Sequence, residues 1–153
     1  MELSSEAQKY LEDYGASLSP ASPDQITQLR EKNADGDTVD YFESLNLAVE
    51  LPIRNLITFD SAEDIIDQMG WNCPDCEVWQ HGFIAFARDM EGRVYCFDQN
   101  HRDEAGRSKI VRHPYPVGDD CTLEGAIKAS EPIAENFLEF ISLLMADPNI
   151  ELD

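Results

Sequence analysis

The cysteines are the residues whose spacing most directly suggests metal or redox chemistry. Cys73 and Cys76 form a single C-x-x-C pair, whereas the other two cysteines stand alone far downstream. A structural zinc ion needs four converging thiolate or imidazole ligands, which two paired knuckles usually supply. The remaining ligands on offer, none with paired spacing, are Cys96, Cys121, His81 and His113. Because only one of the two cysteine pairs is present, we interpret Cys73 and Cys76 as ordinary thiols and not as zinc ligands.

The surroundings of this pair also argue against a redox function. A reactive C-x-x-C motif begins a helix that makes the first thiol more acidic, but the residues after Cys76 do not continue as a helix. The carboxylates of Asp75 and Glu77 would oppose a thiolate by like-charge repulsion. We therefore expect reduced cysteines and no bound metal or cofactor.

An acidic segment at residues 31–36 is similar to the start of an EF-hand calcium loop. Such a loop requires a bidentate carboxylate at its twelfth position, which is Phe42 here, with Glu43 one residue late. A helix end followed by a helix cap at Asp37 or Thr38 explains the same residues. We therefore expect no calcium site.

Motifs of the common catalytic classes are missing from the sequence. It contains no glycine-rich phosphate loop, no G-x-S-x-G elbow and no H-E-x-x-H helix. Three histidines and many carboxylates would permit an acid–base pair, but their abundance makes any particular pairing uninformative. We therefore expect a protein that is not an enzyme and has no catalytic residues.

Acidic and aromatic residues around the C-x-x-C pair form the strongest candidate for a binding surface. Trp71 and Trp79 flank the pair, and six carboxylates fall within 18 residues of one another around them. Rigid aromatic anchors are typical of protein interfaces. The predicted partner-contact residues are Asp60, Glu63, Asp64, Asp67, Trp71, Asp75, Glu77 and Trp79, followed by Asp119, Asp120 and Glu124.

The overall charge is strongly negative and limits the kinds of partner. The 153 residues include 31 Asp and Glu against 11 Lys and Arg, a formal net charge of −20. Because nucleic-acid phosphates and anionic lipids attract Lys and Arg, we expect binding to neither nucleic acid nor membrane. The first residues lack the basic and apolar regions of a signal peptide. No segment has the roughly 18 apolar residues of a membrane span, so we expect a cytoplasmic protein.

The negative charge is unevenly distributed along the chain. Residues 1–87 contain 17 acidic and 4 basic residues, residues 88–112 contain 5 and 6, and residues 113–153 contain 9 and 1. One nearly neutral stretch therefore separates two acidic ones. Such a field keeps a protein soluble and also speeds its encounter with a basic partner, and both interpretations remain open.

Helical signals dominate the first third of the chain. The spacing of apolar residues predicts a helix over Ser4–Tyr14. A serine N-cap, a proline in the first turn and a glutamine three residues after the cap predict that another helix begins at Ser22. A third helix would carry the apolar residues of Val39–Leu45.

Strand signals follow these helices. Leu51–Phe59 predicts one strand, and Ser61–Gly70 a short helix whose first turn suits its carboxylates. Phe83–Ala87 and Val94–Phe97 flank a turn with a glycine, which predicts a hairpin. Because these apolar runs are nearly continuous, both faces of the hairpin should be covered. Lys109–Arg112 predicts a further strand.

Apolar residues recur at three- and four-residue intervals from Ile133 to Met145 and predict a closing helix. Helices at both ends of an antiparallel sheet are typical of the α+β class. The sequence contains no low-complexity tract and no long linker. We therefore expect a single domain over residues 1–153.

The order of these segments resembles that of the SUKH superfamily over residues 38–146. Leu56–Ile66 is similar to a strand and short helix of that superfamily, Gly82–Ala87 with Glu91–Asp98 to its central hairpin, and Ile133–Ile141 to its closing helix. The resemblance implies a bent, mostly antiparallel sheet with a central hairpin, flanked by N-terminal helices and a C-terminal helix. It implies no catalytic centre, because many bacterial members are immunity proteins that neutralise polymorphic toxins, often nucleases.

Charge and resemblance favour the same function. A nuclease toxin presents cationic groups to phosphates, so an acidic inhibitor complements its site. We expect an immunity protein that binds a basic toxin, in which residues 1–37 form an acidic helical extension before the SUKH-like core. One alternative is a regulatory or scaffold module that binds a cellular protein, as fungal relatives do in cell-wall synthesis. A less favoured alternative is a metal-binding or redox protein that uses the C-x-x-C pair.

Overall fold

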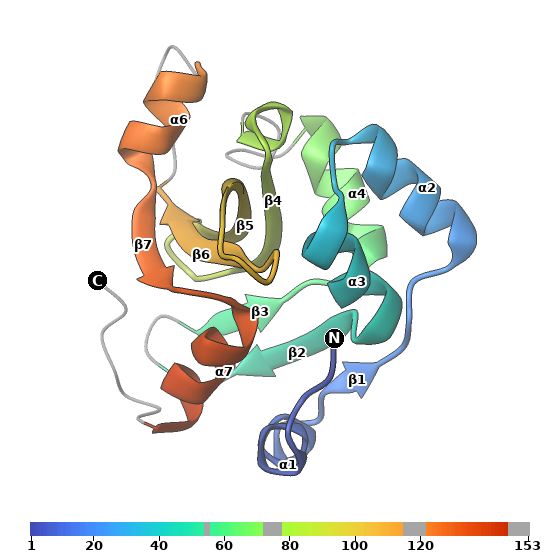
Figure 1. The fold of residues 1–153 in the computed structure, drawn as a ribbon. Helices are drawn as coiled ribbons and strands as arrows, with labels where there is room; N and C mark the ends of the chain where they lie inside the picture. The colour runs from blue at the N-terminus through green and yellow to red at the C-terminus, as the bar shows by residue number, and fades with distance from the viewer. Residues whose placement is uncertain (54–55, 72–77, 115–121, 147–153) are drawn as a thin grey trace.

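One antiparallel sheet of seven strands forms the framework of the fold (Figure 1). The computed structural model describes residues 1–53, 56–71, 78–114 and 122–146, and every element below lies within these ranges. Each strand pairs with its neighbours in sequence, so the sheet is a meander with β1 and β7 at its edges. The strands are β1 (Ser17–Leu18), β2 (Leu47–Leu51), β3 (Ile57–Phe59), β4 (Phe83–Arg88), β5 (Val94–Arg102), β6 (Ser108–His113) and β7 (Glu131–Ala134).

Helices surround this sheet. Figure 1 shows α2, α3 and α4 grouped beside it, with α1 at one end of the molecule and α6 at the other. The helices are α1 (Ser5–Asp13), α2 (Pro23–Glu31), α3 (Gly36–Ser44), α4 (Ala62–Trp71), the short 3-10 helix η1 (Trp79–His81), α6 (Leu123–Ala129) and α7 (Phe137–Ala146). Helices around a bent antiparallel sheet confirm the predicted α+β class.

The predicted start of α2 is confirmed at the level of its hydrogen bonds. The backbone N–H of Gln25 donates to Ser22 Oγ at 3.2 Å, and the N–H of Ser22 donates to Gln25 Oε1 at 3.0 Å. This capping box satisfies two N–H groups that the first turn of a helix leaves unpaired. Leu29 is then buried on the inner face of the helix, and Leu11 of α1 is buried in the same hydrophobic cluster.

β4 and β5 form the predicted central hairpin, in which Ile84 pairs with Phe97 and Ala85 with Cys96. All residues in the two apolar runs Phe83–Ala87 and Val94–Phe97 are buried. Both faces of the hairpin are therefore covered, as continuous apolar runs predict.

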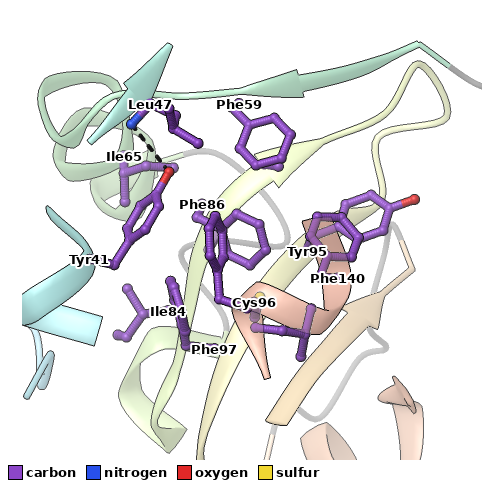
Figure 2. Packing of buried hydrophobic residues seen from close by; sticks show 14 of the residues in the cluster. Tyr41, Leu47, Phe59, Ile65, Ile84, Phe86, Tyr95, Cys96, Phe97 and Phe140 are labelled. Atoms are coloured by element: carbon purple, nitrogen blue, oxygen red, sulfur yellow. Dashed lines mark hydrogen bonds between the residues drawn. The ribbon is translucent and has the colours of Figure 1, made fainter. Parts of the chain in front are cut away.

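Aromatic rings from several elements meet around Phe86 on β4 (Figure 2). The centroid of its ring lies 4.9 Å from that of Phe97, and rings from α3, β3 and α7 also contact it. The Tyr41 hydroxyl from α3 accepts a hydrogen bond from the N–H of Leu47 at 3.3 Å, and burial raises the pKa of this hydroxyl. The polar end of Tyr41 thus binds backbone while its ring packs in the core.

The turns after β4 and β5 share the pattern D-x-x-G-R, at residues 89–93 and 103–107. In each turn the aspartate Oδ1 accepts two backbone N–H groups, and Oδ2 accepts the arginine Nε–H at 2.8 Å. The glycine has a φ of 79° in both turns, a conformation that favours glycine. Asp89 is buried whereas Asp103 is exposed, so the same turn occurs at two depths.

The single strand predicted over Leu51–Phe59 is wrong, because this segment belongs to two strands. Val49 of β2 pairs with Phe59 of β3 in antiparallel register, so the chain reverses between the two strands. Pro52 follows β2 directly and lacks the N–H that a sheet ladder needs. Leu56 precedes β3 with a φ of 50°, which is incompatible with an extended strand.

The closing helix begins later than its apolar spacing predicts. Ile133 belongs to the edge strand β7, and α7 starts at Phe137 after Asn136, whose Oδ1 accepts the N–H of Glu139 at 2.9 Å. The short helix α6 before β7 was not predicted. Its N-cap is Thr122, whose hydroxyl accepts the N–H of Gly125 at 3.0 Å.

The predicted cap of α3 also lies two or three residues too late. α3 begins at Gly36 with Asp35 at the N-cap position, and no side-chain hydrogen bond caps the helix. The carboxylate of Asp37 instead accepts the N–H and the hydroxyl of Ser108, each at 2.7 Å. A contact with β6 therefore takes the place of the expected cap.

Candidate protein-interaction surface

The outer side of α4 carries three exposed carboxylates, Glu63, Asp64 and Asp67. Its inner side buries apolar residues, among them Ile65 and Met69. With 3.6 residues per turn, the three acidic residues lie together on the face opposite these apolar ones. We call Glu63, Asp64 and Asp67 the acidic α4 face.

No cation of the described residues neutralises this face. Lys, Arg and His side chains in the described ranges all lie more than 4.0 Å from these carboxylates. Glu63 and Asp67 are four residues apart, a spacing at which like charges cost about 0.2–0.5 kcal/mol in a helix. The positive end of the helix dipole offsets part of this cost for Glu63 and Asp64 in the first turn. Local stability therefore gives a weak reason for this charge pattern.

The arginines of the nearly neutral stretch are engaged with other carboxylates. Each of the five arginines between residues 88 and 112 forms an ion pair. The pairs are Arg88–Asp60, Arg93–Asp89, Arg102–Asp35, Arg107–Asp103 and Arg112–Glu131. The charges of these five arginines are therefore balanced by carboxylates within the fold.

The cations at the C-terminal end of α2 also have partners outside the acidic α4 face. Arg30 Nη2 lies 3.9 Å from Glu43 Oε1 on α3, and Lys32 Nζ lies 4.4 Å from the centre of the Trp79 ring. α2 contacts α4 and exposes Asp24 and Glu31. The two neighbouring helices thus both expose carboxylates, while Arg30 is paired at the surface with Glu43 and Lys32 lies over the Trp79 ring.

Asp60, a predicted contact residue, is instead part of the folded interior. It is 9% exposed, and Arg88 Nε donates to its Oδ2 at 2.8 Å, while Arg88 also donates to Gln68 on α4. Burial raises the pKa of Asp60, although the hydrogen bond and charge of Arg88 act in the opposite direction. Its carboxylate holds α4 to the sheet through Arg88, and we leave it out of the contact surface.

The other predicted contact residues are not brought together on one surface. Trp79 is half-buried with Lys32 over its ring, so this tryptophan is not a free anchor. Glu124 is exposed in the first turn of α6, which Figure 1 places across the sheet from α4. The side chain of Trp71 and all of Asp75, Glu77, Asp119 and Asp120 lie outside the described residues.

A polar groove of about 390 Å³ lies next to the end of α2. Its walls come from the α2–α3 loop, η1, the end of β5 and Leu123 of α6. Gln99 joins two of these walls, because its amide donates to the Asn33 carbonyl at 2.7 Å and accepts the N–H of Asp35 at 2.9 Å. Gln99 is not among the predicted site residues, because nothing local to β5 in the sequence indicates a contact with a loop 66 residues earlier.

Of the residues considered for zinc, Cys96 and His113 occupy ordinary buried positions, whereas His81 of η1 is half-buried. Cys96 is buried in β5, and His113 is buried at the end of β6 with Nε2 2.9 Å from the Ala126 carbonyl oxygen. The described ranges contain no group of three or more His, Cys, Asp or Glu placed to hold a metal ion. Cys73, Cys76 and Cys121 lie outside those ranges.

Comparison of the chain with protein-family models and with curated proteins gives no match. Within the described residues, no helix has the length and apolar character needed to cross a bilayer. A functional proposal must therefore be argued from the residues and their arrangement.

Proposed function

We propose that this protein is a non-catalytic binding module, an immunity protein that neutralises a basic toxin by covering its cationic site. The observation that carries the proposal is the acidic α4 face, whose carboxylates have no cation partner within the described ranges while every described arginine is paired. The resemblance to the SUKH superfamily points in the same direction, as does the net charge of −20.

Electrostatics also explains why such a surface suits an inhibitor of a nuclease. A nuclease must hold phosphates with exposed Lys and Arg, so its active site attracts a dense group of carboxylates. Because these carboxylates stand on a helix, the backbone that carries them is already ordered when the partner binds. A basic site can therefore bind the acidic α4 face quickly, because its carboxylates attract cations and have no cation partner among the described residues.

The proposal is tested by capturing the partner from a lysate of the source organism at low and moderate salt. Each retained protein is identified, expressed alone and assayed for toxicity, then assayed again with the acidic protein present. We expect a basic toxin that is retained in stoichiometric amount and silenced on binding. Recovery of non-toxic cellular proteins alone would contradict the immunity function and favour a regulatory or scaffold module.

A charge-reversal variant then tests the surface. In Glu63→Lys/Asp64→Lys/Asp67→Lys, we expect the association rate to fall about tenfold or more and its dependence on salt to flatten. The matched control reverses three exposed acids in the N-terminal region and changes the net charge equally. This control, Glu2→Lys/Glu6→Lys/Glu12→Lys, should retain most of the rate. Equal loss in both variants would show that net charge, and not the acidic α4 face, governs association.

A further inference from the structure

His113, the last residue of β6, is a buried imidazole that contacts α6. It has no exposed surface, and its ring packs edge-on against Phe83 with centroids 4.6 Å apart. Its Nε2 lies 2.9 Å from the carbonyl oxygen of Ala126, whereas Nδ1 has no hydrogen-bond partner within the described part of the chain. Because a carbonyl only accepts, Nε2 carries the proton and Nδ1 is the unprotonated nitrogen of a neutral ring.

α6 is held to the rest of the fold by few groups. Among the seven residues Leu123–Ala129, only Ala126 is buried. Leu123 is 47% exposed and Ile127 is 39% exposed, so the apolar side chains of α6 add little burial. The place of α6 on the sheet thus depends largely on Ala126 and on the bond from its carbonyl to His113.

A proton on Nδ1 would change this balance. The new N–H would be a buried donor without an acceptor, and the ring would carry a charge among apolar groups. Burial already lowers the pKa of His113, which shows the direction of this cost. A short helix with one buried residue is easier to displace than a sheet strand. We propose that His113 is an acid-sensitive latch: its protonation releases α6 from β6 and reshapes the polar groove that Leu123 lines.

The acidic groups near His113 do not remove the cost of protonation. Asp98 on β5 and Glu131 on β7 both favour a charged imidazole. However, Asp98 Oδ2 lies 2.7 Å from His101 Nδ1, and Glu131 Oε2 lies 2.6 Å from Arg112 Nη2. Both carboxylates already have partners, and burial remains the larger influence on His113.

The remaining elements around the imidazole offer no acceptor for Nδ1 within the described residues. β4 contributes the ring of Phe83, and α6 contributes its backbone near Ala126. The charged residues of α6 are Glu124 and Lys128, both exposed to solvent. Among the described residues, a protonated ring is therefore solvated only by opening toward water.

The latch is tested by hydrogen exchange of the whole protein, followed by NMR from about pH 7 to about pH 5 and corrected for intrinsic exchange rates. Below about pH 6.5, protection of the α6 amides should fall about tenfold per pH unit relative to the α7 amides, because one proton is linked to opening. In His113→Gln, a side-chain amide can donate to Ala126 without titrating, so protection of α6 should not follow pH. The control Lys128→Gln, at an exposed position of the same helix, should behave like the wild type.

A second measurement keeps the inference testable if His113→Gln does not fold. Imidazole ¹⁵N shifts of the wild type should show His113 gaining its second proton at the acidic end of the range in which α6 loses protection, where the open form becomes the main one. Three results would overturn the latch: α6 and α7 amides that respond to pH in parallel, an unchanged pH response in His113→Gln, or a protonated His113 beneath a fully protected α6. None of these readouts requires the toxin partner, so the latch and the proposed function can fail separately.

Discussion

Truncation of Asp89 should destabilise the protein far more than truncation of Asp103, although the two residues make matching hydrogen bonds. Each aspartate accepts two backbone N–H groups and the Nε–H of an arginine four residues later. The difference is exposure: the side chains of Asp89 and Arg93 are 0% and 16% exposed, whereas those of Asp103 and Arg107 are 35% and 50% exposed. A comparison of Asp89 with Asp103 therefore shows how burial changes the stability that the same set of hydrogen bonds provides.

The expected loss for Asp89→Ala follows from the groups that remain. Two backbone N–H groups and the Nε–H of Arg93 lose their acceptor at a site with little access to water. Removing one partner of a buried ion pair costs about 3–5 kcal/mol, and Arg93 Nη2 retains Glu91 at 2.7 Å. We therefore expect a loss of about 3 kcal/mol, or roughly 6–12 °C in melting temperature for a domain of this size. At Asp103, water replaces the lost acceptor, and the loss should be much smaller.

Urea unfolding of the wild type, Asp89→Ala and Asp103→Ala measures both losses under the same conditions. The dependence of the unfolding free energy on urea should be unchanged, so that the midpoints report stability alone. High salt should reduce the effect of Asp103→Ala more than that of Asp89→Ala, because exposed charges are screened. Equal losses in the two variants, or a larger loss at Asp103, would refute the role assigned to burial.

Three further predictions test the core, the buried ion pair and the acidic α4 face. Phe86→Ala should cost about 3–5 kcal/mol in urea unfolding, because it opens a cavity among five aromatic rings; a loss below about 1 kcal/mol would contradict this packing. Burial raises the pKa of Asp60 above its ordinary value, so its contribution to stability is largest at low pH and falls as pH rises through the folded-state pKa. Asp60→Asn removes this titration, and from about pH 4 to about pH 7 the unfolding free energy of the variant should improve relative to the wild type; a constant difference would contradict the raised pKa. Asp67→Lys should raise the unfolding free energy by up to about 0.5 kcal/mol by relieving repulsion with Glu63, while weakening partner binding; a loss of stability would show that Asp67 has a structural partner.

The parts of the fold that were predicted correctly are those determined by neighbouring residues. The capping box at Ser22 is formed within four residues, and the hairpin of Phe83–Phe97 is defined by two apolar runs and the turn between them. The errors arose where a local pattern had two solutions. Ile133 continues the helical spacing of α7, yet Pro132 and the pairing of β7 with β6 place it in a strand.

Contacts between distant segments could not be predicted from local patterns. Arg102 contacts Asp35 across 67 residues, and Ser108 donates to Asp37 across 71 residues. These bonds decide which acids are neutralised, and no periodicity signals them. The same limit applies to the binding surface: Asp60 is close to the α4 acids in sequence, but the fold places Arg88 beside it. The repeated D-x-x-G-R pattern, in contrast, is visible in the sequence and was available to predict both turns.

The pairing of arginines connects the stability of the fold to its surface charge. A chain with net charge −20 opposes its own compaction, and the fold places each described arginine within 4.0 Å of a carboxylate. Several of these pairs join segments far apart in sequence, so the cations hold the meander together where repulsion would open it. The same pairing leaves no described arginine to neutralise Glu63, Asp64 and Asp67. The acidic α4 face is exposed without an arginine partner because the described arginines pair with other carboxylates. A basic partner would supply the positive charge that these three acids lack.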